Sequence, residues 1–140
     1  MSKSDNAENS ILALIFNATS WTGIAINHGT PATTLTVALH TADPGEAGTQ
    51  STSEVSYTGY ARVAVARTSG GWTVTANSVS PVATISFGQR SDVGSATITH
   101  FSVGTGTGNV MLYSGTVTPN IVVSQGVTPQ LSTSSTITED

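Results

Sequence analysis

The sequence predicts a mainly β protein, a β-sandwich of the jelly-roll or Greek-key type with one N-terminal α-helix. Ser and Thr occupy 43 of the 140 positions (19 and 24), whereas only 9% of the residues are charged. Thr is β-branched and favours extended backbone, and the 14 glycines supply turns between short apolar segments. We therefore expect a single domain over residues 1–140, with a helical arm at about residues 5–22.

Composition excludes several classes of partner. The net charge is −4, and the four basic residues (Lys3, Arg62, Arg67, Arg90) form no cluster that would neutralise phosphates, so we expect no nucleic acid. No apolar run approaches the roughly 20 residues of a membrane span, and the apolar stretch "ILALIF" follows an acidic start, unlike a signal peptide. Without cysteine, stability must come from packing or from association.

The helix is predicted at residues 5–22, in "DNAENSILALIFNATSWT". Asp5 or Asn6 is the expected N-cap, and Glu8 favours the first turn. Its apolar positions form a wide stripe: Ile11, Leu12, Leu14, Ile15 and Phe16. A short helix this apolar must dock on a sheet or on another subunit.

Short β segments follow, separated by turn residues. We predict strands at residues 34–40, 60–67, 71–77, 82–87, 96–103, 110–114, 121–123 and 136–138. The "TSGG" at residues 68–71 indicates a hairpin turn, and "VGTGTGNV" at 103–110 a second turn or loop.

The segment "HTADPG" carries the nearest approach to a catalytic or metal site. His40 and Asp43 are residue types that could act as a general base with its orienting acid, or as two ligands of a metal ion. An Asp-Pro-Gly turn explains the same spacing, with Asp43 accepting backbone hydrogen bonds and Gly45 adopting a positive φ. We favour the turn, with His40 ending a strand and donating to a carbonyl or water. His28 and His100 are expected to be single structural side chains, His100 half-buried on its strand.

The arginines and aromatic residues have structural and interface interpretations. Arg62 and Arg67 are five residues apart and would point to opposite faces of one strand, so they form no clamp. Both arginines are expected to form an ion pair, with Glu54 or Glu46, or hydrogen bonds to loop carbonyls. The alternative is that they anchor a protein interface, where Arg and Tyr are enriched, and Tyr57 and Tyr60 suit either role. Trp72 is expected in the core, with an exposed binding role as the alternative.

Several segments together resemble a family of small tailed-phage virion proteins often labelled tail fibre proteins, of which similar proteins serve as capsid decoration or cement proteins. The segments are "AENSILALIF", "LHTADPGEAGTQSTSEVSYTGYARVAVAR", "GGWTV", "SATITHFSVGT", "VMLYSGTVT" and "TITED". The stretch "SFGQRSDVGSAT" at residues 86–97 departs from the pattern, and Arg90 and Asp92 are expected to be exposed at its tip.

The resemblance implies a virion structural protein made in the bacterial host cytoplasm. We expect no enzymatic activity, metal or cofactor. The first role expected is capsid decoration on the outer head surface, the alternative is a tail or head fibre component, and a carbohydrate- or receptor-binding module is third. The expected partners are further copies of the chain, as a homotrimer, and the major capsid protein or other virion proteins. The candidate interface residues are Ile11, Leu12, Ile15, Phe16, Trp21, Tyr57, Tyr60 and Arg62.

Overall fold

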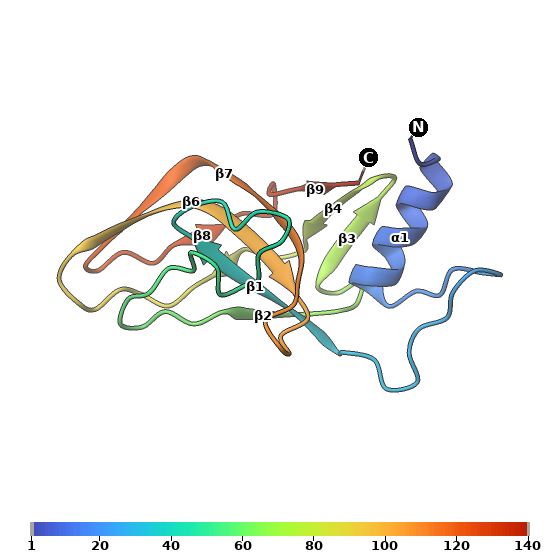
Figure 1. Cartoon of the computed structure of the whole chain (residues 1–140), viewed down its shortest axis with the longest axis horizontal. Helices are drawn as coiled ribbons and strands as arrows, with labels where there is room; N and C mark the ends of the chain where they lie inside the picture. The colour runs from blue at the N-terminus through green and yellow to red at the C-terminus, as the bar shows by residue number, and fades with distance from the viewer. Residues whose placement is uncertain (1, 140) are drawn as a thin grey trace. The chain divides into compact units, whose positions relative to one another are not determined.

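A computed structural model describes residues 2–139 and confirms the predicted class: mainly β, sandwich-like, with one helix near the N-terminus. The elements shown in Figure 1 are α1 (Asp5–Asn17), β1 (Thr34–His40), β2 (Val63–Ala66), β3 (Trp72–Thr75), β4 (Ser78–Pro81), β5 (Ile85–Ser86), β6 (Ser95–Gly104), β7 (Met111–Ser124), β8 (Gln130–Leu131) and β9 (Ile137–Thr138). The strands form sheets of order β2-β1-β6-β7, β3-β4-β9 and β5-β8.

The described residues divide into two compact units, each built from separate segments. Residues 2–34, 65–84 and 131–139 form one unit, here called the helical unit. Residues 35–64 and 85–130 form the other, here called the sheet unit.

The helix of the helical unit is shorter than predicted and has a different cap. Ser4 is the N-cap and accepts a hydrogen bond from the Ala7 N–H, whereas Asp5 and Asn6 lie inside the helix. The helix ends at Asn17 rather than at residue 22 because Ala18 adopts a left-handed conformation, with φ +55°.

The helix packs on β3 and β4, beside it in Figure 1. Leu12 and Phe16 are fully buried, and the Phe16 ring meets Trp72 edge-on with centroids 4.9 Å apart. Trp72 is 2% exposed, which confirms its predicted place in the core. Leu12, Phe16 and Trp72 thus anchor α1 to this sheet.

The turn at residues 68–71 forms, but the predicted hairpin around it is wrong. The Gly71 and Trp72 N–H groups both donate to the Thr68 carbonyl, at 2.9 and 3.0 Å. However, β2 pairs in the sheet that contains β1, whereas β3 pairs antiparallel with β4. The hairpin is therefore β3–β4, and its turn places Ala76 at φ +52°.

In the sheet unit, β1 lies next to β6, which in turn pairs with β7. The prediction for β1 is confirmed at both ends, residues 34–40. The strands predicted at residues 110–114 and 121–123 are parts of the single long strand β7, which begins at Met111 and returns antiparallel from β6 through the predicted loop. The register Val37↔Val103 and Leu39↔Phe101 aligns apolar residues of β1 and β6.

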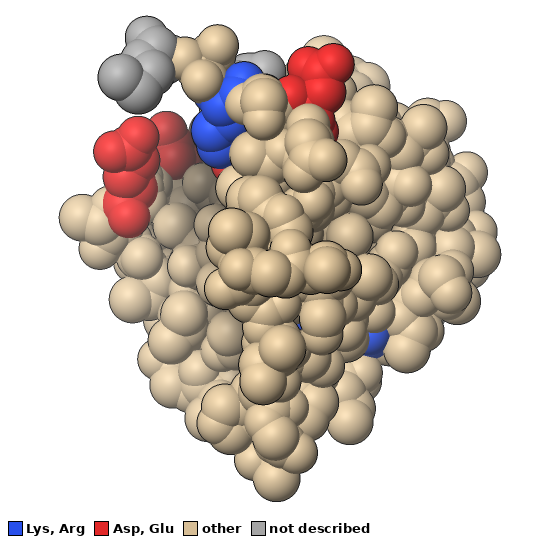
Figure 2. Space-filling view, turned by 90° about the vertical axis from the view of Figure 1, so that its right-hand side faces the viewer, with Lys and Arg blue, Asp and Glu red and all other residues tan. Residues whose placement is uncertain are grey.

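The charged side chains are few and unevenly distributed. On the face shown in Figure 2, most of the acidic and basic atoms gather near the upper edge, a few basic atoms appear lower down, and most of the face carries no charge. Lys3 pairs with Glu139 at 3.2 Å in the helical unit. Uncharged polar and apolar groups therefore dominate the surface that faces the viewer.

Candidate functional site

The segment "HTADPG" forms the predicted turn. The Asp43 Oδ1 atom accepts a hydrogen bond from the Gly45 N–H at 2.8 Å, and Gly45 has φ +69°. Pro44 is buried between them. The Asp43 carboxylate thus stabilises the backbone at this position, and no contact joins it to the His40 ring.

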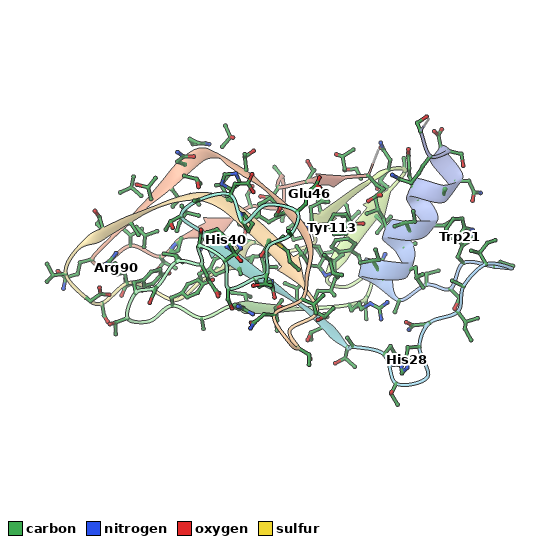
Figure 3. The ribbon with its side chains drawn as sticks, viewed as in Figure 1. Trp21, His28, His40, Glu46, Arg90 and Tyr113 are labelled. Carbon is green, nitrogen blue, oxygen red and sulfur yellow. The ribbon has the colours of Figure 1, made fainter. Side chains whose placement is uncertain are left out.

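His40 lies inside the sheet unit, within a buried polar network (Figure 3). Its Nδ1 lies 2.8 Å from the Thr52 carbonyl and its Nε2 lies 2.7 Å from the Ser102 Oγ atom. Since a carbonyl only accepts, Nδ1 carries the proton and Nε2 accepts from the serine hydroxyl. This confirms the prediction that His40 ends a strand and donates to a backbone carbonyl.

Gln50 completes the network from the other side. Its Nε2 donates to the Thr36 carbonyl at 3.0 Å and approaches Ser102 Oγ at 3.4 Å, while its Oε1 accepts from the Thr36 hydroxyl at 2.8 Å. His40, Gln50 and Ser102 are 0% exposed. The Ser–His pair resembles a nucleophile with its base, but a substrate has no access to atoms this deeply buried, so the network holds β1, β6 and the intervening loop together.

Burial lowers the pKa of His40 below its ordinary value. The charges of Arg62 and His100 act in the same direction. The hydrogen bond to the Thr52 carbonyl and the Glu54 carboxylate oppose the shift without cancelling it. The imidazole is therefore neutral in the folded chain under conditions where it would be half-protonated in the unfolded chain.

This shift predicts a loss of stability on acidification. The unfolded chain binds a proton at His40 below a pH of about 6.5, whereas the folded chain binds it only at lower pH. The stabilisation is therefore fully present above that pH and is lost as the pH falls toward the folded pKa. We expect the free energy of unfolding, measured with urea, to fall from about pH 7.5 to about pH 5.5, and His40→Gln to flatten this decrease.

The control for that experiment is His28→Gln, because His28 is exposed in the helical unit. This variant should keep the pH dependence of the parent chain. An undiminished decrease in His40→Gln would assign the effect to other groups.

Arg62 makes the predicted ion pair with Glu54. Its Nε and Nη2 atoms donate to the two carboxylate oxygens at 2.8 and 2.7 Å, a bidentate geometry. The Tyr60 hydroxyl donates to the same carboxylate at 3.0 Å and accepts from the Leu39 N–H at 3.0 Å. Burial is the main cause of a strongly raised Tyr60 pKa. Arg62, Glu54 and Tyr60 thus bond to one another rather than presenting free groups to a ligand.

Arg67 has its polar contacts within the helical unit. Its Nε and Nη2 atoms donate to the carbonyls of Ile15 and Leu14, both at 2.6 Å, in the last turn of α1. Its Nη1 donates to Asn27 Oδ1 at 3.0 Å. One guanidinium therefore satisfies carbonyls at the C-terminus of the helix and also fixes the loop that follows.

Arg90 is buried, so the expectation that it is exposed at a loop tip is wrong. It is 8% exposed, lies over the Tyr57 ring at 5.8 Å from its centroid, and donates to Asp92 Oδ2 at 2.8 Å. Asp92 also accepts from the Thr58 N–H at 2.8 Å, and this bond is the main cause of its lowered pKa. Pairing with Asp92 and the contact with the Tyr57 ring offset part of the guanidinium's loss of water, whereas the buried Nε of Arg90 has no hydrogen-bond partner among the described residues.

The eight candidate interface residues differ in exposure. Leu12, Phe16 and Tyr57 are buried by contacts inside the chain. Five are half-buried: Ile11, Ile15, Trp21, Tyr60 and Arg62. The role of all eight residues at an interface remains a prediction. The five half-buried side chains are more accessible to a partner than the three buried ones.

Two exposed residues near Trp21 were not predicted. Ile24 is 71% exposed and Ile26 is 86% exposed, in the loop after α1 where Figure 3 marks Trp21. Both residues lie beyond the predicted helix, which ends at residue 22, and large apolar residues beside Gly23 are the sequence signal for them.

A shallow hollow of about 210 Å³ lies in the sheet unit, lined by Asp43, Gly45, Glu46, His100, Ser114, Gly115 and Thr116. His100 is half-buried, as predicted, and its Nδ1 lies 2.8 Å from the Thr99 hydroxyl. Although His40 and His100 are register partners, no group of three or more His, Asp or Glu residues among residues 2–139 is arranged to hold a metal ion. No helix in the same range is long and apolar enough to cross a membrane.

A β-rich chain with these internally bonded polar groups matches a family model of phage fibre proteins, over residues 2–138. The family is that of the Podophage GP4 fiber I protein gp80, and this chain belongs to it. No curated protein matches the chain. The chain is accordingly a phage virion structural protein, as its resemblance to small virion proteins predicted.

Proposed function

We propose that the chain is a non-enzymatic component of a fibre on the phage virion. The observation that carries this proposal is the family match over residues 2–138, because the family is described as that of a fibre protein. The polar side chains that resemble catalytic groups support a structural role. Ser102 and His40 are buried, and Arg62 and Glu54 bind one another.

Capsid decoration is the second candidate, favoured by the size of the chain. A 14.2 kDa protein without heptads or an internal repeat does not build a long shaft from its own sequence. Many copies of a compact oligomer, each bound weakly at several points to the major capsid protein, would instead stabilise a head.

A carbohydrate-binding role has less support. Trp72 and Tyr57 are 2% and 8% exposed, and neither presents a ring face on which a sugar would stack. Trp21 is the aromatic residue with the most suitable setting, in an exposed loop.

Copy number distinguishes the two structural roles. For a fibre component, we expect quantitative mass spectrometry of purified virions to find a few dozen copies or fewer per particle, set by the number of fibres. Hundreds of copies, a sizeable fraction of the major capsid protein, would instead favour decoration. Immunogold labelling of intact particles gives the location independently, and labelling spread over the head would contradict the fibre assignment.

In either role we propose a homo-oligomer, with a trimer as the expected number. A virion attachment made of several weak contacts gains effective affinity when the subunits are linked. The low charge of the chain also favours association, because few ions need to be desolvated at a subunit interface.

A further inference from the structure

The loop of residues 18–33, here called the apolar loop, exposes large hydrophobic side chains to water. Ile24 and Ile26 are 71% and 86% exposed, close to the half-buried Trp21. Exposed single hydrophobic residues are common, but two isoleucines and a tryptophan within six residues form a local patch. Such patches on soluble proteins mark places where another surface binds.

Hydrogen bonds hold the apolar loop in one conformation. Trp21 and Ala25 exchange backbone hydrogen bonds at 2.8 and 2.9 Å, and Gly23 adopts φ +78° in the tight turn between them. The Asn27 N–H donates to Ser20 Oγ at 3.3 Å, and the Asn27 side chain accepts from Arg67. The isoleucines are therefore presented on a preformed turn, which reduces the entropy lost when a partner binds.

The same turn provides both a protrusion and a recess. Residues 20–26 line a hollow of about 260 Å³ in the helical unit. Ile24 and Ile26 are among the residues that line it, and most of their surface is in water. A surface that carries both features within one short segment is suited to contact with an identical copy of itself, because the isoleucines of one copy can pack against the hollowed turn of the other.

Charge supports an identical copy as the occupant. Residues 9–42 contain no Asp, Glu, Lys or Arg, and the one guanidinium described as reaching the loop, that of Arg67, is bonded to Asn27 and to carbonyls of α1. Most of the face shown in Figure 2 carries no charge. Around a rotation axis the same segment meets itself, so any charge near the axis would face a like charge. A lipid surface is a weaker match, because peripheral membrane binding combines apolar residues with a rim of basic ones.

We propose that the apolar loop is a self-association surface, in which Ile24 and Ile26 of one copy pack against residues 20–26 of a second copy. This inference rests on the homo-oligomer of the proposed function and adds the location of its contact. The contact repeats identically in any closed ring, so it is compatible with the expected trimer.

Light scattering coupled to size-exclusion chromatography tests the proposal on the full chain. The parent chain should elute as a multiple of 14.2 kDa. Replacing both isoleucines, by Ile24→Ser and Ile26→Ser together, should weaken association by about 100-fold or more, since two large apolar side chains lose their burial. The matched control is Val93→Ser, because Val93 is also apolar and 85% exposed but belongs to the sheet unit.

A cross-linking variant gives a second readout that does not depend on affinity. The chain has no cysteine, so Ile26→Cys introduces a single thiol. Under mild oxidation this variant should form a disulfide-linked dimer, whereas Val93→Cys should remain largely unlinked. Equal linking of the two variants would overturn the proposal.

The outcomes separate this inference from the proposed function. An oligomeric parent with an equally oligomeric double serine variant would overturn the apolar loop as the contact while keeping the homo-oligomer. A parent that is monomeric at about 100 μM, roughly 100-fold above a micromolar dissociation constant, would overturn both. The fibre assignment itself is decided separately by copy number and by the position of the immunogold label.

Discussion

Replacing Phe16 by alanine is expected to lower the free energy of unfolding by about 3–5 kcal/mol. Phe16 is 0% exposed, and its ring meets Trp72 edge-on in the contact that joins α1 to β3. Removing the ring loses its burial and leaves a cavity that the flanking strand cannot fill. Urea unfolding followed by circular dichroism measures the effect.

The matched control for Phe16→Ala is Val82→Ala in the same helical unit. Val82 is 46% exposed, so truncation there should change the free energy of unfolding by about 0.5 kcal/mol or less. Similar losses in the two variants would mean that α1 does not depend on the Phe16–Trp72 contact.

A second large loss of stability is expected from Gly88→Ala, which adds only one methyl group. In the sheet unit the Gly59 carbonyl oxygen occupies the space that a Cβ atom on residue 88 would need, well inside contact distance. The obstacle is backbone rather than a flexible side chain, so the two chain segments must separate. Tyr57 donates to the Gly88 carbonyl at 2.7 Å, and this bond would be displaced as well. We expect a loss of about 3 kcal/mol.

Gly29→Ala is the control for that substitution. No heavy atom lies within 4 Å of a Cβ placed at Gly29. The variant should therefore unfold within about 0.5 kcal/mol of the parent in urea. If Gly88→Ala were equally neutral, the close approach of residues 59 and 88 would not be a feature of the folded chain.

The parts of the fold that were predicted correctly have strong local signals. β1 is predicted to the residue because an apolar segment ends two residues before Asp-Pro-Gly, and the side chain of Asp43 forms the turn that this motif favours. The pairing of Arg62 with Glu54 follows from opposite charges eight positions apart around a polar loop. Local chemistry determined each of these features.

Most of the features that were missed depend on contacts distant in sequence. The helix ends at an alanine in the left-handed conformation, where glycine is the usual signal, and the carbonyls before it bind Arg67 from a segment about fifty residues away. The buried guanidinium of Arg90 lies over the ring of Tyr57, from a distant segment, and donates a hydrogen bond to the nearby Asp92. The β3–β4 hairpin turns at Ala76, which carries no turn signature. No local pattern identifies partners of this kind.

The internal bonding of the arginines has a consequence for proteolysis. Trypsin cuts after Lys and Arg, and this chain offers four such positions. Arg62, Arg67 and Arg90 are each fixed through the guanidinium to a carboxylate or to backbone carbonyls. Cleavage at these positions requires local unfolding, so its rate should follow the population of opened molecules rather than the number of sites. A virion component with this property would be cut by trypsin more slowly than a comparably loop-rich protein with free arginines.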